Sequence, residues 1–182
     1  MPWALPPRRA LALAAILAAI LCGGSRRAEA DADATDDPPL IAVEGRVGYG
    51  MAFGGGAGVS VERWSPVTLS GLVETAVWSD PWASIFGGVA VEGHGRGAAG
   101  AIGGLRLRPT RGQLRLSGGL AAMFFPETAF GPMASGGTCW GLGAMNLCGD
   151  VEATMYVIGS DIPDQRVAGQ IQLVVGVGFD AL

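Results

Sequence analysis

Apolar and polar residues alternate along most of this sequence after residue 40. The last stretch, from Gln170 to Phe179, shows the pattern most clearly. One of its faces carries Ile171, Leu173, Val175, Val177 and Phe179, and the other carries Gln170, Gln172, Val174, Gly176 and Gly178. A period of two residues is typical of a β-strand with one apolar side.

The same alternation predicts eight strands. They span Leu40–Met51, Val67–Trp78, Ala83–Gly93, Ala98–Arg108, Gln113–Phe124, Ser135–Leu142, Met145–Val157 and Val167–Phe179. Glycine accounts for 31 of 182 residues, well above its usual share of about 7%, and it is a poor helix former. We therefore expect an all-β fold.

The connections between these strands are predicted to alternate in length. The longer series is Gly54–Ser65, Glu92–Gly97, Pro126–Ala134 and Gly159–Arg166, and the shorter series is Ser79–Trp82, Pro109–Gly112 and Gly143–Ala144. Loops at one end and tight turns at the other are the layout of an up-and-down barrel. Both chain ends then lie on the tight-turn side, which would face the periplasm.

Charged residues avoid the apolar face of every predicted strand. The opposite face carries both charge signs, on Glu44, Arg46, Glu74, Glu92, Arg106, Arg108, Arg115, Asp150 and Glu152. A soluble periplasmic β-barrel with an apolar interior would also explain this alternation. In a membrane barrel, the charged face would instead fill the narrow interior that eight strands enclose.

Two features favour the membrane barrel. An Arg at mid-depth on a lipid-facing surface costs about 2–4 kcal/mol, so charge is expected to be excluded from that face. The aromatic residues Tyr49, Phe124, Trp140 and Phe179 lie near predicted strand ends, as in interfacial aromatic belts. We expect an eight-stranded antiparallel up-and-down transmembrane β-barrel whose lumen is filled by paired charges.

Residues 1–30 have the pattern of a secretory signal peptide. Two arginines near the start precede an apolar core from Ala10 to Cys22, which is shorter than the roughly 20 residues of a membrane-spanning helix. A small-x-small cleavage site ends at Ala30; a lipoprotein site at Cys22 and an uncleaved anchor are the alternatives. We expect cleavage after Ala30, a flexible acidic lead-in over residues 31–39 and one β-barrel domain over residues 40–182.

Charge excludes one class of partner. Cleavage after Ala30 leaves eight Arg, no Lys and 15 acidic residues, and therefore a net charge of −7. Nucleic-acid binding needs clustered cations to neutralise phosphates, so we expect no nucleic-acid partner.

Two cysteines remain after cleavage, and export favours a disulfide between them. If Gly143 and Ala144 form a two-residue hairpin loop, Cys139 lies directly opposite Cys148. That pair occupies a non-hydrogen-bonded position, where Cα atoms lie about 4.5 Å apart, within disulfide range. The sequence therefore predicts a Cys139–Cys148 disulfide.

The chain resembles the small bacterial outer-membrane barrels, a class that includes the transmembrane domain of outer-membrane protein A. The resemblance rests on the size of the domain, on the pattern of its strands, and on an alternating final strand with an aromatic residue near its end. The resemblance covers about Leu40 to Leu182. It implies a place in the bacterial outer membrane, contact with its lipid and insertion by the barrel-assembly machinery. One departure is that Asp180, Ala181 and Leu182 follow Phe179, whereas the class often ends on the aromatic residue.

The sequence shows little catalytic chemistry. Some barrels of this class are lipid-modifying enzymes that use a His with a Ser and an acid, which makes His94 with Glu92 a candidate base. Ser60, Ser79 and Ser84 show no evident placement near His94. A single His is a poor metal site, and the glycine runs lack the Lys-Ser/Thr ending of a phosphate loop, so we expect no metal and no cofactor.

We therefore expect a non-enzymatic outer-membrane barrel with an envelope-structural or surface-interaction role, in which a surface ligand would contact the long loops. The alternatives are a lipid-modifying enzyme that uses His94, a narrow pore, and the soluble periplasmic β-barrel.

Overall fold

The computed structural model describes residues 41–56, 59–79, 82–93, 97–108, 113–142, 144–160 and 167–180. They contain eight strands: β1 (Ile41–Gly56), β2 (Val59–Ser79), β3 (Trp82–Gly93), β4 (Ala98–Arg108), β5 (Leu114–Phe125), β6 (Ala129–Leu142), β7 (Met145–Tyr156) and β8 (Val167–Asp180). Within these residues, no helix is long and apolar enough to cross a membrane. The expected signal peptide and lead-in lie outside the described residues.

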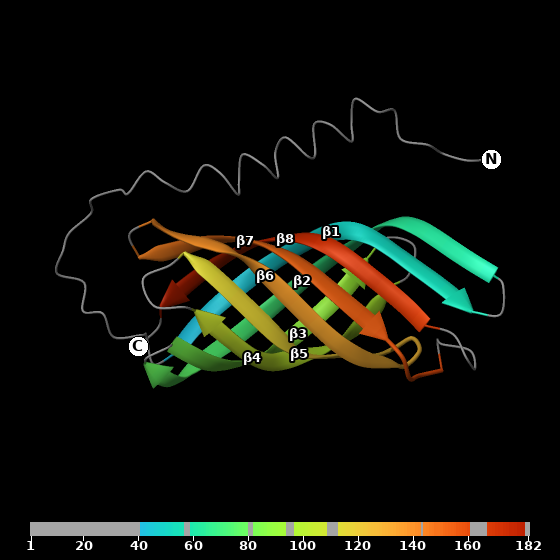
Figure 1. The fold of residues 1–182 in the computed structure, drawn as a ribbon, viewed down its shortest axis with the longest axis horizontal. Helices are drawn as coiled ribbons and strands as arrows, with labels where there is room; N and C mark the ends of the chain where they lie inside the picture. Colours follow the sequence, from blue (N-terminus) through green and yellow to red (C-terminus); the bar gives the residue numbers. More distant parts are fainter. Residues whose placement is uncertain are drawn as a thin grey trace, which may run out of the picture. The chain divides into compact units, whose positions relative to one another are not determined.

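The eight strands form a closed barrel in sequence order. Each strand pairs antiparallel with the next, and β8 returns to pair with β1 through partners such as Ala42 and Asp180. Figure 1 shows the strands wrapping obliquely around a common axis. The predicted fold class is therefore confirmed. We call the barrel end that holds Ile41 and Asp180 the terminal end, and the opposite end the loop end.

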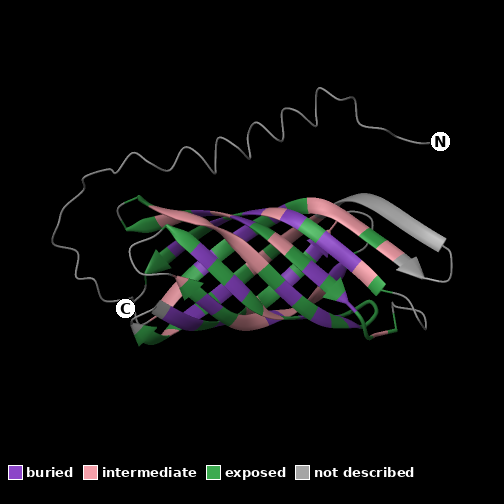
Figure 2. Cartoon of the chain, in the orientation of Figure 1, coloured by how far each residue is buried: buried purple, intermediate pink, exposed green. Residues whose placement is uncertain are grey.

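Burial alternates along the strands, as the purple and green bands of Figure 2 show. Large apolar residues point outwards and are exposed; they include Val43, Val47, Leu69, Val73, Ile85, Val89, Leu105, Leu107, Leu116, Leu120, Val151, Met155, Val175 and Val177. Charged residues on the other face are buried in the lumen, as is Val174. The alternative of a soluble barrel with an apolar interior is therefore wrong, because its two faces would be reversed.

The predicted long loop Gly54–Ser65 is wrong. Gly54, Gly55 and Gly56 continue β1, and residues 59–65 begin β2, with pairs such as Gly54 with Val61 and Gly56 with Val59. A triple glycine reads as a loop because it lacks side chains, but its backbone can still form the ladder once a partner strand lies beside it. Only residues 57–58 separate the two strands.

The predicted loop Pro126–Ala134 is also too long, because β6 begins at Ala129 instead of Ser135. Gly131 and Pro132 suggested a loop, yet they pair with Ala121 and Leu120 of β5. A Cβ atom at Gly131 would lie 1.8 Å from the carbonyl oxygen of Met155. Glycine is therefore required at this position for close backbone approach, and it does not end the strand.

These longer strands change the predicted alternation of loop lengths. The connections at the loop end are residues 57–58, 94–97, 126–128 and 157–166, and those at the terminal end are 80–81, 109–113 and 143–144. Only the connection between β7 and β8 is clearly longer, in number of residues, than the other connections. The regular contrast between long loops and short turns is therefore wrong, although Ile41 of β1 and Asp180 of β8, the first and last described residues, do lie at one end of the barrel.

The hairpin of β6 and β7 has the predicted register. Leu142 pairs with Met145, and Cys139 pairs with Cys148. The two cysteines form a disulfide, with their Cα atoms 4.1 Å apart. Cys148 is buried, so the bond lies on the lumen side of the hairpin, near the terminal end.

Candidate functional site

The lumen of the terminal half holds a set of buried ion pairs, which we call the lumen ion cluster. Its members are Glu44, Arg46, Glu74, Arg106, Arg108, Arg115, Asp150 and Glu152. Four arginines thus face four carboxylates. Because buried charges are tolerated only when they are paired, this balance is what allows the barrel interior to be charged.

Arg115 on β5 makes the most extensive contacts of the cluster. Its guanidinium donates to both carboxylate oxygens of Glu44, at 2.8 and 3.0 Å. It also donates to Asp150 on β7 through Nε, at 2.7 Å, and through a second nitrogen. Such two-pronged pairs are stronger than single hydrogen bonds, and these connect β1, β5 and β7 across the lumen.

Arg106 on β4 provides the second crossing. It pairs with Glu44 at 3.0 Å and with Glu74, and its Nε donates to Ser117 Oγ at 3.1 Å. Its guanidinium also lies 5.2 Å from the ring centre of Phe86, within the range of a cation–π contact. Arg106 is 1% exposed, so these contacts replace water almost completely.

Arg46 and Arg108 complete the cluster at its edges. Arg46 pairs with Glu152 at 2.6 Å and lies 3.9 Å from Asp150. Arg108 lies 3.6 Å from Glu74, and its side chain is 20% exposed. The Arg108 pair is therefore longer and more accessible to water than the pairs of the two central arginines, whereas the Arg46–Glu152 pair is short and buried on its Arg46 side.

Glu92, which the sequence grouped with these charges, lies elsewhere. It is buried at 1% exposure, but it is eight residues further along β3 than Ser84, towards the loop end. The structure thus brings eight of the nine predicted lumen charges together. Sequence reasoning did not assign Ser84 and Ser117 to the lumen ion cluster, and their position on the polar face of β3 and β5 was the only signal for that role.

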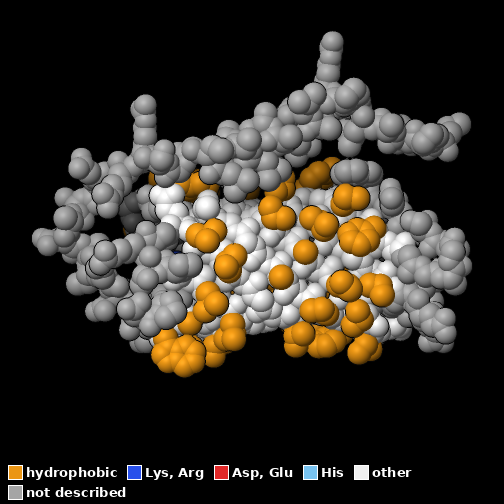
Figure 3. Space-filling model, in the orientation of Figure 1, with side chains coloured by type: hydrophobic (Ala, Val, Ile, Leu, Met, Phe, Trp, Pro, Cys, Tyr) orange, Lys and Arg blue, Asp and Glu red, His pale blue; other side chains and the backbone are white. Residues whose placement is uncertain are grey.

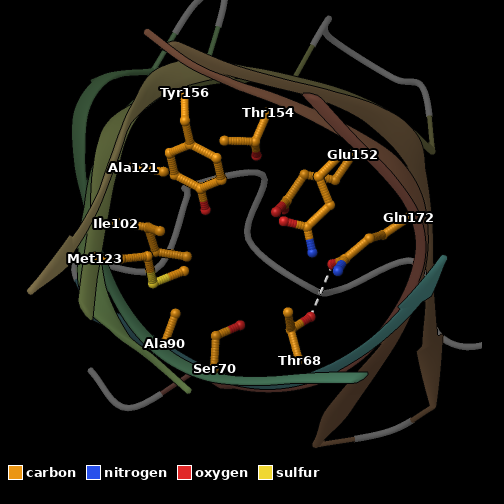
Figure 4. Close-up of a pocket in the computed structure, with 11 residues that line it drawn as sticks. Thr68, Ser70, Ala90, Ile102, Ala121, Met123, Glu152, Thr154, Tyr156 and Gln172 are labelled. Atoms are coloured by element: carbon orange, nitrogen blue, oxygen red, sulfur yellow. Dashed lines mark hydrogen bonds between the residues drawn. The ribbon is translucent and has the colours of Figure 1, made fainter. Parts of the chain in front are cut away.

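The loop half of the lumen contains a small cavity, which Figure 4 shows. One wall is polar and comes from β2, β7 and β8; it consists of Thr68, Ser70, Glu152, Thr154, Gln170 and Gln172. The facing wall consists of Ala90, Ile102, Ala121 and Met123, with Tyr156 beside it. The cavity measures about 20 Å³, so it is too small for an organic ligand.

The proposed catalytic group is not assembled among the described residues. His94 lies outside them. Ser84 donates to Glu74 at 2.5 Å in the lumen ion cluster, and Ser79 ends β2 at the terminal end. Ser60 is also distant from Glu92, because it lies eight residues along β2 from Thr68, and Thr68 is the cross-strand partner of Glu92. The described part of the chain also holds no group of three or more residues suited to a metal ion.

The outer surface carries aromatic residues at both ends of the barrel. Trp78 and Phe179 are exposed near the terminal end, and Tyr49, Phe53, Phe124, Phe125 and Phe130 are exposed near the loop end. Figure 3 shows hydrophobic side chains across the visible barrel surface between these ends. On β2, the outward-facing Val67 and Val77 are ten residues apart, which is roughly 34 Å along the strand. At a strand tilt of ~40° this distance becomes ~26 Å along the barrel axis, which is close to the height of the apolar band of membrane barrels.

A closed antiparallel barrel with an apolar exterior, aromatic ends and a charged interior defines the chain as a small β-barrel of the bacterial outer-membrane class. Some solved structures are similar to this chain. One is Ail, the attachment invasion locus protein of Yersinia pestis, with 14% identity over 76% of this chain and 98% of that chain and a TM-score of 0.49. Another is Neisserial surface protein A, with 9% identity over 78% of this chain and 97% of that chain and a TM-score of 0.48. No protein-family model matches the sequence, and no curated protein matches it.

Proposed function

We propose that this chain is a non-enzymatic, non-conducting barrel that supports the outer membrane and presents its loop end for contacts at the cell surface. The observation that carries the proposal is the lumen ion cluster. Its pairs join side chains of β1, β2, β4, β5 and β7 across the interior. The lumen therefore serves as a packed core, and the outward surfaces remain for interaction.

The closed lumen counts against the alternative of a narrow pore. A solute would have to separate Arg115 and Arg106 from Glu44, where each contact is 3.0 Å or shorter. Each separated charge would remain in a narrow interior with few replacements for its partner. Between the lumen ion cluster and the loop end, the cavity of about 20 Å³ has room for one water molecule or slightly more. A cavity of this size does not form a continuous channel.

Surface contact is supported by the order of the loop end. Thr128, in the turn between β5 and β6, and Ser160, after β7, hydrogen bond reciprocally through backbone N–H and side-chain oxygen atoms, at 3.0 and 3.1 Å. Phe130 also forms an isolated bridge with Ile158. Phe125 and Ile158 are both more than 60% exposed, at 68% and 66%. This side of the loop end thus presents apolar groups on a fixed backbone, as a docking surface requires.

The partners that fit this proposal follow from the same surfaces. Outer-membrane lipid would cover the apolar exterior, and the barrel-assembly machinery would handle the chain during insertion. A surface ligand would contact the loop end through the β1–β2 hairpin, residues 126–128 and the connection after β7. The first two regions are shorter than the predicted loops Gly54–Ser65 and Pro126–Ala134, and the third contains the predicted loop Gly159–Arg166.

Fractionation with gel mobility and planar-bilayer recording tests the proposal. We expect the protein in the outer-membrane fraction, a different gel mobility before and after boiling, and no stable conductance from the folded form. Protein boiled before reconstitution is the control for leakage by unfolded chains. Steady single-channel steps from folded protein would overturn the closed lumen, and recovery in a salt wash would overturn the membrane location.

A further inference from the structure

Gln172 of β8 carries a buried polar atom that no described residue satisfies. The residue is 4% exposed. Its side-chain oxygen accepts a hydrogen bond from Thr68 Oγ1 at 2.8 Å, and its Nε2 atom has no hydrogen-bond partner. Exchanging the amide oxygen and nitrogen changes nothing essential, because the Thr68 hydroxyl can bond either atom. One amide atom is left without a protein partner in both orientations.

The side chain of Gln172 lines the cavity in the loop half of the lumen. Gln172 and Thr68 both line that cavity, and Figure 4 shows their hydrogen bond at its edge. Glu152, the direct cross-strand partner of Gln172, lines it as well. A donor and a carboxylate acceptor therefore lie on adjacent strands around one small space.

A glycine makes room for this arrangement. Gly48 of β1 lies between Thr68 on β2 and the neighbourhood of Gln172 on β8. A Cβ atom at Gly48 would lie 2.4 Å from Thr68 Oγ1 and 2.6 Å from Gln172 Oε1. The contact between Thr68 and Gln172 therefore depends on the absence of a side chain on the strand between them.

The size of the cavity decides which ligand fits. It measures about 20 Å³, and a water molecule needs roughly 10–15 Å³ measured in this way together with two to four polar partners. Cavities that take up even benzene are much larger, about 150 Å³ and apolar. Water therefore fits the volume and can satisfy the buried amide atom, whereas an organic molecule is too large for the cavity.

We propose that the loop half of the lumen is a binding site for an ordered water molecule, held by Gln172 and the polar wall around Glu152. The water accepts a hydrogen bond from Gln172 Nε2 and donates to oxygen atoms of that wall, of which the Glu152 carboxylate is the charged one. Glu152 already accepts a hydrogen bond from Arg46 at 2.6 Å. The water thus extends the polar contacts of the lumen ion cluster towards the loop end, where the facing wall is apolar.

Nuclear magnetic resonance on the folded, isotope-labelled protein in detergent micelles tests the site, with water itself as the probe. We expect a magnetisation-transfer signal from long-lived water to the side-chain amide protons of Gln172, which are assigned by their loss in Gln172→Met. Met123→Leu is the matched control, because it conserves volume on the apolar wall and should keep the signal. Absence of the water signal at Gln172 in the wild-type protein overturns the proposal.

A stability measurement gives an independent result. The double variant Thr68→Val with Gln172→Met removes both members of the direct hydrogen bond and leaves neither of them unsatisfied, a change that by itself is nearly neutral for stability. If water satisfies Gln172, the urea midpoint of unfolding falls. If the site is dry, the midpoint is unchanged or rises, since an unsatisfied polar atom has been removed, and the proposal fails. Neither result depends on conductance, so failure here is distinguishable from failure of the proposed function.

Discussion

The three arginines Arg115, Arg106 and Arg108 should contribute to stability in that order. Replacing each by Met keeps much of the side-chain volume and removes the charge. Loss of one partner from a buried ion pair costs about 3–5 kcal/mol, because the other charge stays buried without compensation. An exposed pair contributes about 0–1 kcal/mol. The contacts that remain after each change decide where in this range each variant falls.

Arg115→Met should have the largest effect. It leaves Asp150 with Arg46 at 3.9 Å, while Glu44 keeps Arg106 at 3.0 Å. We expect a loss of about 4–5 kcal/mol. In Arg106→Met, Glu74 keeps the hydrogen bond from Ser84 at 2.5 Å, and Glu44 keeps Arg115. The expected loss is therefore smaller, about 3 kcal/mol.

Arg108→Met should cost least, about 1 kcal/mol. Its contact with Glu74 is 3.6 Å long, and its side chain is 20% exposed, so water can replace part of what is lost. A second variant, Arg115→Met with Asp150→Asn, restores the charge balance and should recover a large part of the stability lost in Arg115→Met.

Urea unfolding in lipid vesicles, followed by tryptophan fluorescence and by gel mobility, measures these differences. With a slope of about 2 kcal/mol per molar urea, a loss of 4 kcal/mol moves the midpoint by roughly 2 M. His94→Ala, a change outside the lumen strands, is the control and should leave the midpoint in place. Equal midpoints for Arg115→Met, Arg108→Met and His94→Ala would refute the reasoning that the lumen ion cluster holds the barrel together.

Three further changes test other parts of the structure. Gly119→Ala should impair folding in a gel-mobility assay, because its Cβ atom would lie 2.2 Å from the Gly103 carbonyl oxygen. Gly45→Ala is the control and should fold as the wild type does, because its Cβ atom would meet nothing within 4 Å. Reduction of the Cys139–Cys148 disulfide should lower the free energy of unfolding by about 2–3 kcal/mol, as expected for opening a loop of about ten residues, and should therefore lower the urea midpoint; an unchanged midpoint would contradict this. Val89→Arg places a charge on the exterior at a site that is 66% exposed, and it should cost about 2–4 kcal/mol in vesicles; a cost near zero would argue that Val89 does not face lipid.

The orientation of every strand could be predicted from the sequence because the two faces meet opposite solvents. Lipid excludes charge from one face, so Val89 and Leu105 could be assigned to the exterior without any structure. The narrow lumen accepts charge only in balanced pairs, so Arg106 and Arg115 could be assigned to the interior. A period of two residues carries this information locally, and no knowledge of the neighbouring strands is needed.

The ends of the strands and the contact partners of the side chains were harder to predict from the sequence, because they depend on the neighbouring strands. Gly54 and Gly131 lack the side chains that signal a strand, and their pairing follows from strands beside them. The pair of Arg46 and Glu152 joins residues separated by 106 positions, and these meet because closure of the barrel places β8 between β1 and β7. By contrast, Cys139 and Cys148 belong to one hairpin, so a two-residue loop was enough to align them.

The ion pairs that close the lumen are also the ones that bind the strands to one another. Glu44 accepts from Arg115 and Arg106, so a path through the barrel cannot open at Glu44 without releasing β1 from both β4 and β5. Conductance and instability should therefore rise together across the arginine variants, since the contacts that each variant removes both fill the lumen and join strands. A channel evolved for transport would keep its structural pairs apart from its conducting path. In this barrel the same residues close the lumen and join the strands, which is what the proposed function requires.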